Sequence, residues 1–123
     1  MYDERALRQV LQVVGSVQFD LAEAVFREFE ERDLRTAGVY LALLRSAEAG
    51  ARWADALRLM AELESTGAGG PPPGPVVNSV MRACTNAARH EEAVQVYEHA
   101  ARLRAAPDMQ TFATLIRALG RAG

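Results

Sequence analysis

Residues 74–108, GPVVNSVMRACTNAARHEEAVQVYEHAARLRAAPD, decide the fold because they contain two apolar helical stripes and the breaks that bound them. The first stripe consists of Val77, Val80, Met81 and Cys84, and the second of Ala93, Val96, Tyr97 and Ala100. Both follow the spacing i, i+3, i+4, i+7, which places four side chains on one face of an α-helix. Ala88-Arg89 separates the stripes, and Pro107-Asp108 is typical of a helix stop followed by a new start. The stretch therefore predicts a helix–turn–helix unit.

Both stripes recur along the chain. Counterparts of the second stripe are Ala22, Val25, Phe26, Phe29 and Ala56, Leu59, Met60, Leu63. Counterparts of the first are Tyr40, Leu43, Leu44, Ala47, then Phe112, Leu115, Ile116, Leu119, and a weaker set, Ala6, Val10, Val13. The first-stripe sets begin at residues 6, 40, 77 and 112, which are 34, 37 and 35 residues apart. We therefore predict one all-α repeat array over 1–123, with repeats 3–36, 37–73 and 74–108 and a half-repeat 109–123.

The remaining breaks fall where helix pairs need them. Gly15-Ser16 and Gly50-Ala51 should connect the two helices of a pair, like Ala88-Arg89. The proline-rich segment 65–75 cannot continue a helix and should separate two pairs. Pro71–Pro73 fits either a solvated loop or a polyproline ligand. The chain stops at Gly123, where a second helix should begin, so we interpret it as a fragment. We expect Leu115, Ile116 and Leu119 to be partly uncovered there.

Composition excludes several functions. The formal net charge of −2 provides no overall basic field, and all 14 basic residues are arginines, a bias more typical of a GC-rich genome than of arginine chemistry. Cys84 is the only cysteine, so an intramolecular disulfide is impossible. No apolar run approaches the ~20 residues that cross a bilayer, which argues against a membrane role.

Catalysis and cofactors are not supported by any residue pattern. His90 and His99 should point to different sides of one helix, and Cys84 lies in an apolar stripe, so no metal site is expected. Trp53 should pack between repeats, with base stacking as the alternative. We predict no enzyme activity, no cofactor and no small-molecule substrate.

Residues 74–108 also resemble a known family. They resemble a pentatricopeptide repeat at Asn78, Ala87, Arg89, Glu91-Glu92-Ala93, Val96-Tyr97 and Pro107-Asp108. The run Thr111-Phe112-Ala113-Thr114-Leu115-Ile116 resembles the start of a further copy, whereas 37–73 match less well and 3–36 only in apolar spacing. The tetratricopeptide repeat is the second choice. The resemblance implies a right-handed α-solenoid whose first helices line a concave groove, a mitochondrial or chloroplast location, and single-stranded RNA as ligand.

The resemblance also implies which residues read a base. The family pair, at the fifth and last positions of a repeat, corresponds to Asn78 and Asp108, a combination associated with uracil. At the second position of this repeat, where the family usually has an aliphatic residue, this chain has Pro75. In the other repeats the fifth position is Leu7, Leu41 or Ala113, none of which offers a base edge a hydrogen bond. We therefore expect weak sequence specificity.

Arg45, Arg82 and Arg117 recur 37 and 35 residues apart, at one position of each predicted first helix. They should share a face, where they could contact phosphates or pair with carboxylates. The alternative is that some of them only cover neighbouring helices. Arg52 and Arg89 recur at turns and should be structural.

Two functions follow. The first is a single-stranded RNA-binding module of an organellar RNA-metabolism or translation factor, using Asn78, Asp108, Arg82, Arg45 and Arg117. The alternative is a protein–protein interaction scaffold, or a subunit of a larger organellar complex such as a ribosome. The RNA function predicts phosphate contacts and a uracil preference at one position; the scaffold predicts protein subunits as partners.

Overall fold

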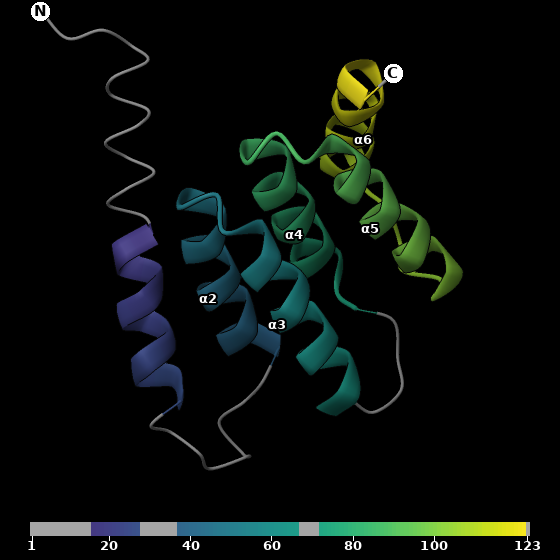
Figure 1. The fold of residues 1–123 in the computed structure, drawn as a ribbon. Helices are drawn as coiled ribbons and strands as arrows, with labels where there is room; N and C mark the ends of the chain where they lie inside the picture. The colour runs from purple at the N-terminus through teal and green to yellow at the C-terminus, as the bar shows by residue number, and fades with distance from the viewer. Residues whose placement is uncertain (1–15, 28–36, 67–71, 123) are drawn as a thin grey trace, which may run out of the picture.

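The computed structural model describes residues 16–27, 37–66 and 72–122, and these ranges consist of α-helices and turns and contain no β-strand (Figure 1). A helix over 16–27 is followed by α2 (Ala37–Ala49), α3 (Trp53–Thr66), α4 (Gly74–Asn86), α5 (His90–Arg102) and α6 (Met109–Ala122). The predicted all-α fold is confirmed for this part of the chain. The predicted helix over Ala6–Val13, the Gly15-Ser16 turn, Phe29 and Pro71 lie outside or at the edge of the described residues.

The helices pack as hairpins against their neighbours. α2 pairs with α3 and α4 with α5, and the first helices α2, α4 and α6 follow one another, with α4 in contact with both others. Each second helix, α3 or α5, also packs on the next first helix. The central helix α4 therefore contacts all four of the other labelled helices.

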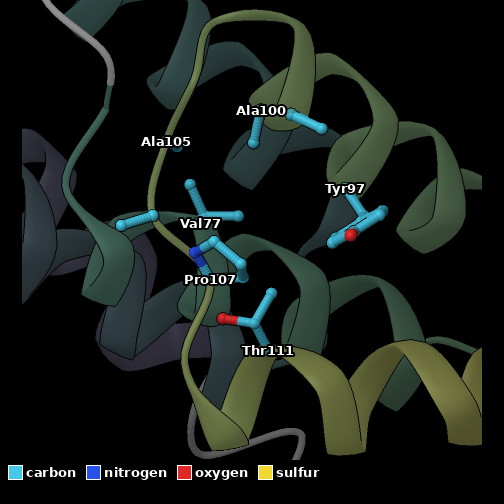
Figure 2. A pocket seen from close by; sticks show the side chains of 8 residues that line it. Val77, Tyr97, Ala100, Ala105, Pro107 and Thr111 are labelled. Carbon is cyan, nitrogen blue, oxygen red and sulfur yellow. The ribbon is translucent and has the colours of Figure 1, made fainter.

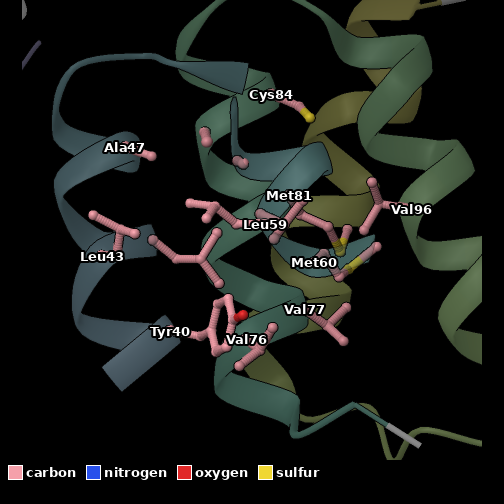
Figure 3. Packing of buried hydrophobic residues seen from close by; sticks show 14 of the residues in the cluster. Tyr40, Leu43, Ala47, Leu59, Met60, Val76, Val77, Met81, Cys84 and Val96 are labelled. Atoms are coloured by element: carbon pink, nitrogen blue, oxygen red, sulfur yellow. The ribbon is translucent and has the colours of Figure 1, made fainter. Parts of the chain in front are cut away.

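The core lies where these hairpins meet (Figure 3). The two copies of the first stripe on α2 and α4 are buried: Tyr40, Leu43, Leu44, Ala47 and Val77, Val80, Met81, Cys84. From α3 and α5, Ala56, Leu59, Met60, Ala93, Val96 and Ala100 join them. Burying one such branched or aromatic side chain stabilises the fold by about 1.5–3 kcal/mol, so helix pairing rests on this shared core.

Three helices end in the same local structure. The backbone of Ala51, Ala88 and Arg104 is left-handed, with φ of 53°, 59° and 63°. The next residue then donates its amide hydrogen to the carbonyl oxygen five residues earlier, as from Arg52 to Ala47 at 2.8 Å and from Arg89 to Cys84 at 2.8 Å. This bond satisfies a helix-terminal carbonyl and reverses the chain. The predicted turns at Gly50-Ala51 and Ala88-Arg89 are confirmed.

The turn arginines stack on aromatic rings near the starts of two helices, 16–27 and α3. The guanidinium carbon of Arg52 lies 4.9 Å from the ring centre of Phe19, and that of Arg89 lies 4.3 Å from the ring centre of Trp53. Phe19 and Trp53 are 34 residues apart, so the contact repeats with the array. A cation over an aromatic face contributes about 0.5–1 kcal/mol when exposed. Arg52 and Arg89 are structural, as expected, and Trp53 packs between repeats.

Apolar and ionic contacts join helix 16–27 to α2 and α3. Phe26 meets Tyr40 edge to face, with ring centres 5.1 Å apart. Arg27 pairs with Glu62 at 2.8 Å, and Arg58 pairs with Glu23 at 2.7 Å. The hydrogen bond from Arg27 is the main cause that lowers the pKa of the Glu62 carboxyl.

This shift predicts an acid-sensitive contribution to stability. Because the folded pKa of Glu62 lies below its unfolded value, the unfolded chain binds more protons at acidic pH, and stability is lost as the pH falls through the folded pKa. Above the unfolded pKa the contribution is complete. Glu62→Gln should therefore reduce the free energy of urea unfolding at neutral pH and flatten its decline toward acid. The matched variant Glu98→Gln, at an exposed position on α5, should leave both unchanged. Parallel pH profiles of Glu62→Gln and the parent chain would contradict this.

The two ends of the described region depart from the repeat pattern. Val25 is exposed although its counterparts Leu59 and Val96 are buried, and the segment expected to cover it lies outside the described residues. On α6 the buried residues are Thr111, Thr114 and Ala118, whereas Phe112, Ile116 and Leu119 are exposed and Leu115 is half-buried. The expectation that Leu115, Ile116 and Leu119 are partly uncovered is thus confirmed. The equivalence of Phe112 with Tyr40 and Val77 does not extend to burial, because no helix among the described residues covers this side of α6.

Candidate nucleic-acid interface

Arg82 connects the three first helices across one polar face. Its Nε donates to Glu48 Oε1 on α2 at 2.7 Å, and its Nη1 donates to Gln110 Oε1 on α6 at 3.1 Å. A side chain of α4 that reaches both neighbours must lie on a face that α2, α4 and α6 share. We call it the arginine face.

Arg45 and Arg117 lie on the same face at its two ends. Arg45 precedes Glu48 by one helical turn, and Arg117 follows Gln110 by two turns, so each shares a helix side with a residue that Arg82 contacts. Both are exposed, whereas Arg82 is half-buried. The predicted row of three arginines is therefore brought onto one face, with its middle member already paired to a carboxylate.

Glu48 is the residue that sequence reasoning missed. Besides Arg82 it accepts a hydrogen bond from Ser79 Oγ at 3.0 Å, and its backbone carbonyl accepts one from Asn86 Nδ2 at 3.0 Å. It thus fastens α2 to α4. The available signal was its position one turn after Arg45 with the opposite charge, but Glu48 has no acidic counterpart at the same position of α4 or α6, where Thr85 and Gly120 stand.

Asn78 and Asp108 are brought together, but they bind each other. Asn78 Nδ2 lies 3.1 and 3.2 Å from the two carboxylate oxygens of Asp108, and its Oδ1 accepts from Thr111 Oγ1 at 2.6 Å. Asn78 is only 2% exposed. Both polar ends of its amide are therefore used within the chain.

Asp108 also caps α6. Its Oδ1 accepts from the Thr111 amide at 2.9 Å, and its own amide donates to Thr111 Oγ1 at 3.1 Å. This reciprocal pair satisfies amide groups that a helix start leaves free. The Thr111 amide is the main cause that lowers the pKa of the Asp108 carboxyl, followed by Asn78. The predicted helix start at Pro107-Asp108 is confirmed, and Asp108 is ionised at neutral pH.

The other expected base-reading positions carry no polar side chain. Leu41 is half-buried, Ala113 and Pro75 are exposed, and Leu7 lies outside the described residues. The arginine face therefore presents separated positive groups, with one internally satisfied Asn–Asp pair between them.

A small apolar hollow lies beside this pair (Figure 2). Val77, Tyr97, Ala100, Ala105, Pro107 and Thr111 line it. Its volume of about 30 Å³ is close to that of one water molecule, far below the ~300–1,000 Å³ of pockets for small ligands. It is a packing gap between α4, α5 and the connection to α6.

Other chemistry finds no support in the described ranges. Over 16–27, 37–66 and 72–122, no three His, Cys, Asp or Glu side chains gather in a metal-binding arrangement. His99 Nε2 instead lies 2.9 Å from Glu64 Oε1, and burial, as the main cause, raises the pKa of the Cys84 thiol to about 12. No helix among the described residues is long and apolar enough to span a bilayer.

Comparison of the chain with protein-family models gives no match, and comparison with curated proteins gives none either.

Proposed function

We propose that this chain is a pentatricopeptide-type repeat array, a right-handed α-solenoid, that binds single-stranded RNA mainly through its phosphates. The observation that supports this most is the arginine face. Arg45 and Arg117 are exposed at its two ends, and Arg121 follows Arg117 by one turn on α6. Guanidinium groups bind phosphate oxygens in a bidentate manner and need no base sequence to do so.

Charge is divided between the two kinds of helix in a way that favours this face. α6 carries Arg117 and Arg121 and no acidic residue, and α4 carries Arg82 alone. The second helices α3 and α5 carry three acidic residues each, whereas the first helices α2, α4 and α6 carry only Glu48. An array with a net charge of −2 can therefore still offer RNA a locally positive surface.

Weak base discrimination is part of the proposal. For Asn78 to read a uracil, its amide would have to leave Asp108 and Thr111, and leaving a buried polar group unpaired costs about 1–3 kcal/mol. An organellar RNA-metabolism or translation factor, in a mitochondrion or a chloroplast as the resemblance implies, would then obtain most of its specificity from other parts of the assembly.

The test is binding of a fluorescent U-rich single-stranded RNA across a salt series. Arg45→Gln and Arg117→Gln should each weaken binding and reduce the slope of log affinity against log salt by about 0.7, the value for one lost phosphate contact on a single strand. Arg102→Gln, which changes another exposed arginine, on α5, is the matched control and should leave the slope unchanged. An A-rich RNA should bind within a few-fold of the U-rich one. Absence of binding at low salt, or equal effects of all three substitutions, would overturn the proposal.

A protein-interaction scaffold is the second candidate, favoured by a different observation. The exposed apolar side chains of α6 lie beside the arginine face and not on it. An exposed stripe of this kind marks protein contact surfaces more often than RNA contact surfaces, which are polar and positively charged.

A further inference from the structure

α6 exposes an apolar stripe along its whole length. Met109 is 83% exposed, Phe112 42%, Ile116 69% and Leu119 51%. Their spacings of 3, 4 and 3 residues put them on one side of the helix. Leu115, half-buried at the edge of the core, continues the stripe. We call these five residues the α6 stripe.

The same positions are covered in the preceding repeats. Phe112, Leu115, Ile116 and Leu119 correspond to Val77, Val80, Met81 and Cys84 on α4, which are at most 3% exposed, and to Tyr40, Leu43, Leu44 and Ala47 on α2, which are at most 4% exposed. Each of these helices packs on the second helix of its own hairpin and on the next first helix: α4 packs on α5 and α6, and α2 packs on α3 and α4. The α6 stripe thus has the pattern of a surface that receives a helix at two other places in this chain.

The second helices show what such an occupant looks like. Each presents a small residue followed by larger ones at i+3 and i+4: Ala56, Leu59, Met60 on α3 and Ala93, Val96, Tyr97 on α5. Each is also acidic. α3 has Asp55, Glu62 and Glu64 against Arg58, and α5 has Glu91, Glu92 and Glu98 against Arg102, so three acidic residues against one arginine give each helix a formal charge of −2.

The charge of α6 is complementary to such a helix and unfavourable for a second copy of itself. Arg117 and Arg121, without any acidic residue, give α6 a formal charge of +2. Two α6 stripes packed face to face would bring +2 against +2, whereas a second-helix type of occupant brings −2.

We propose that the α6 stripe binds an acidic amphipathic α-helix of a partner protein, seated as α5 is seated on α4. This inference rests on the scaffold function, the second candidate above, and is independent of RNA binding. The partner helix carries a small residue and two larger apolar residues at i, i+3 and i+4, and its net negative charge is attracted by the formal charge of +2 on α6.

The probe for this surface is a fluorescent peptide of residues 90–102, the α5 sequence, held helical by a covalent staple on its outer side because a helix of this length is marginal alone. Fluorescence anisotropy should show saturable binding to the chain. Ile116→Asp should weaken it about tenfold or more, since it places a charge in the apolar contact. Leu103→Asp in the chain, an exposed leucine at the end of α5, is the matched control and should have no effect. Circular dichroism should show the same helix content for both variants.

A second peptide, with Glu91, Glu92 and Glu98 replaced by glutamine, tests the charge argument. It should bind at least several-fold more weakly, and the difference should shrink with salt. Equal binding of the two peptides would overturn the acidic partner while leaving the scaffold function standing. No binding of either peptide would overturn both.

Sedimentation of the chain alone should give a monomer; a dimer dispersed by Ile116→Asp would mean that a second copy occupies the stripe. RNA affinity of Ile116→Gln, which adds no charge beside Arg117, should equal that of the parent chain, so failure here is distinguishable from failure of the RNA proposal.

Discussion

Tyr40→Ala is expected to lower the free energy of unfolding by about 3–5 kcal/mol, the usual cost of truncating a buried aromatic side chain. Tyr40 is completely buried at the junction of three elements, where its ring meets Phe26 and the core of α2 and α4 (Figure 3). Truncation removes apolar contacts on both sides of α2 and leaves a cavity. Urea unfolding followed by circular dichroism measures the loss.

Tyr40→Phe separates the ring from the hydroxyl. The hydroxyl oxygen is buried and has no hydrogen-bond partner among residues 16–27, 37–66 and 72–122, so removing it should leave stability unchanged or raise it slightly. A large loss in Tyr40→Phe would show that the hydroxyl is hydrogen-bonded in solution. A small loss in Tyr40→Ala would show that helix 16–27 does not pack on α2 as described.

Asn78→Ala is expected to lower the free energy of unfolding by about 1–3 kcal/mol, because Thr111 and Asp108 each lose a partner in a buried or capping position. The effect should be largest for α6, which Asn78 fastens to α4. Hydrogen exchange of α6 amides, together with urea unfolding, measures both the local and the overall loss.

Gln95→Ala provides the matched control, since it removes an amide from an exposed position on α5 and should change stability by less than about 0.5 kcal/mol. The same variants also distinguish two roles of Asn78. Unchanged stability of Asn78→Ala, accompanied by a selective loss of affinity for U-rich RNA, would show that Asn78 serves RNA and not the junction between helices.

Much of the fold was predictable because its determinants are local or periodic. Alternating stripes such as Val77–Cys84 and Ala93–Ala100 need only the 3.6-residue helical period, and Asp108 caps a helix through contacts within three residues. Burial on α6 was less predictable. The stripe of Phe112 resembles that of Val77, yet its burial depends on which element packs there, and the face of α6 that is buried carries two threonines and an alanine.

The part of the candidate site that was predictable from the sequence is the part that recurs with the repeat. Arg45, Arg82 and Arg117 recur with the repeat, so their common face followed from their spacing. Glu48 does not recur, and its pairing with Arg82 spans 34 residues. The pairing of Asn78 with Thr111 spans 33 residues and also depends on how closely α6 approaches α4. Contacts of this range depend on tertiary packing, which no periodic pattern encodes.

Trp53 is the only tryptophan in the chain, and it lies beneath the guanidinium of Arg89 at the joint between two hairpins. Its indole is therefore sensitive to the distance between neighbouring hairpins and much less to helix content. Intrinsic emission and far-ultraviolet spectra then report different events: the first reports the parting of adjacent hairpins, the second the melting of individual helices. In an array whose contacts run between neighbours, comparing the two signals therefore shows whether the hairpins separate one after another or all at once.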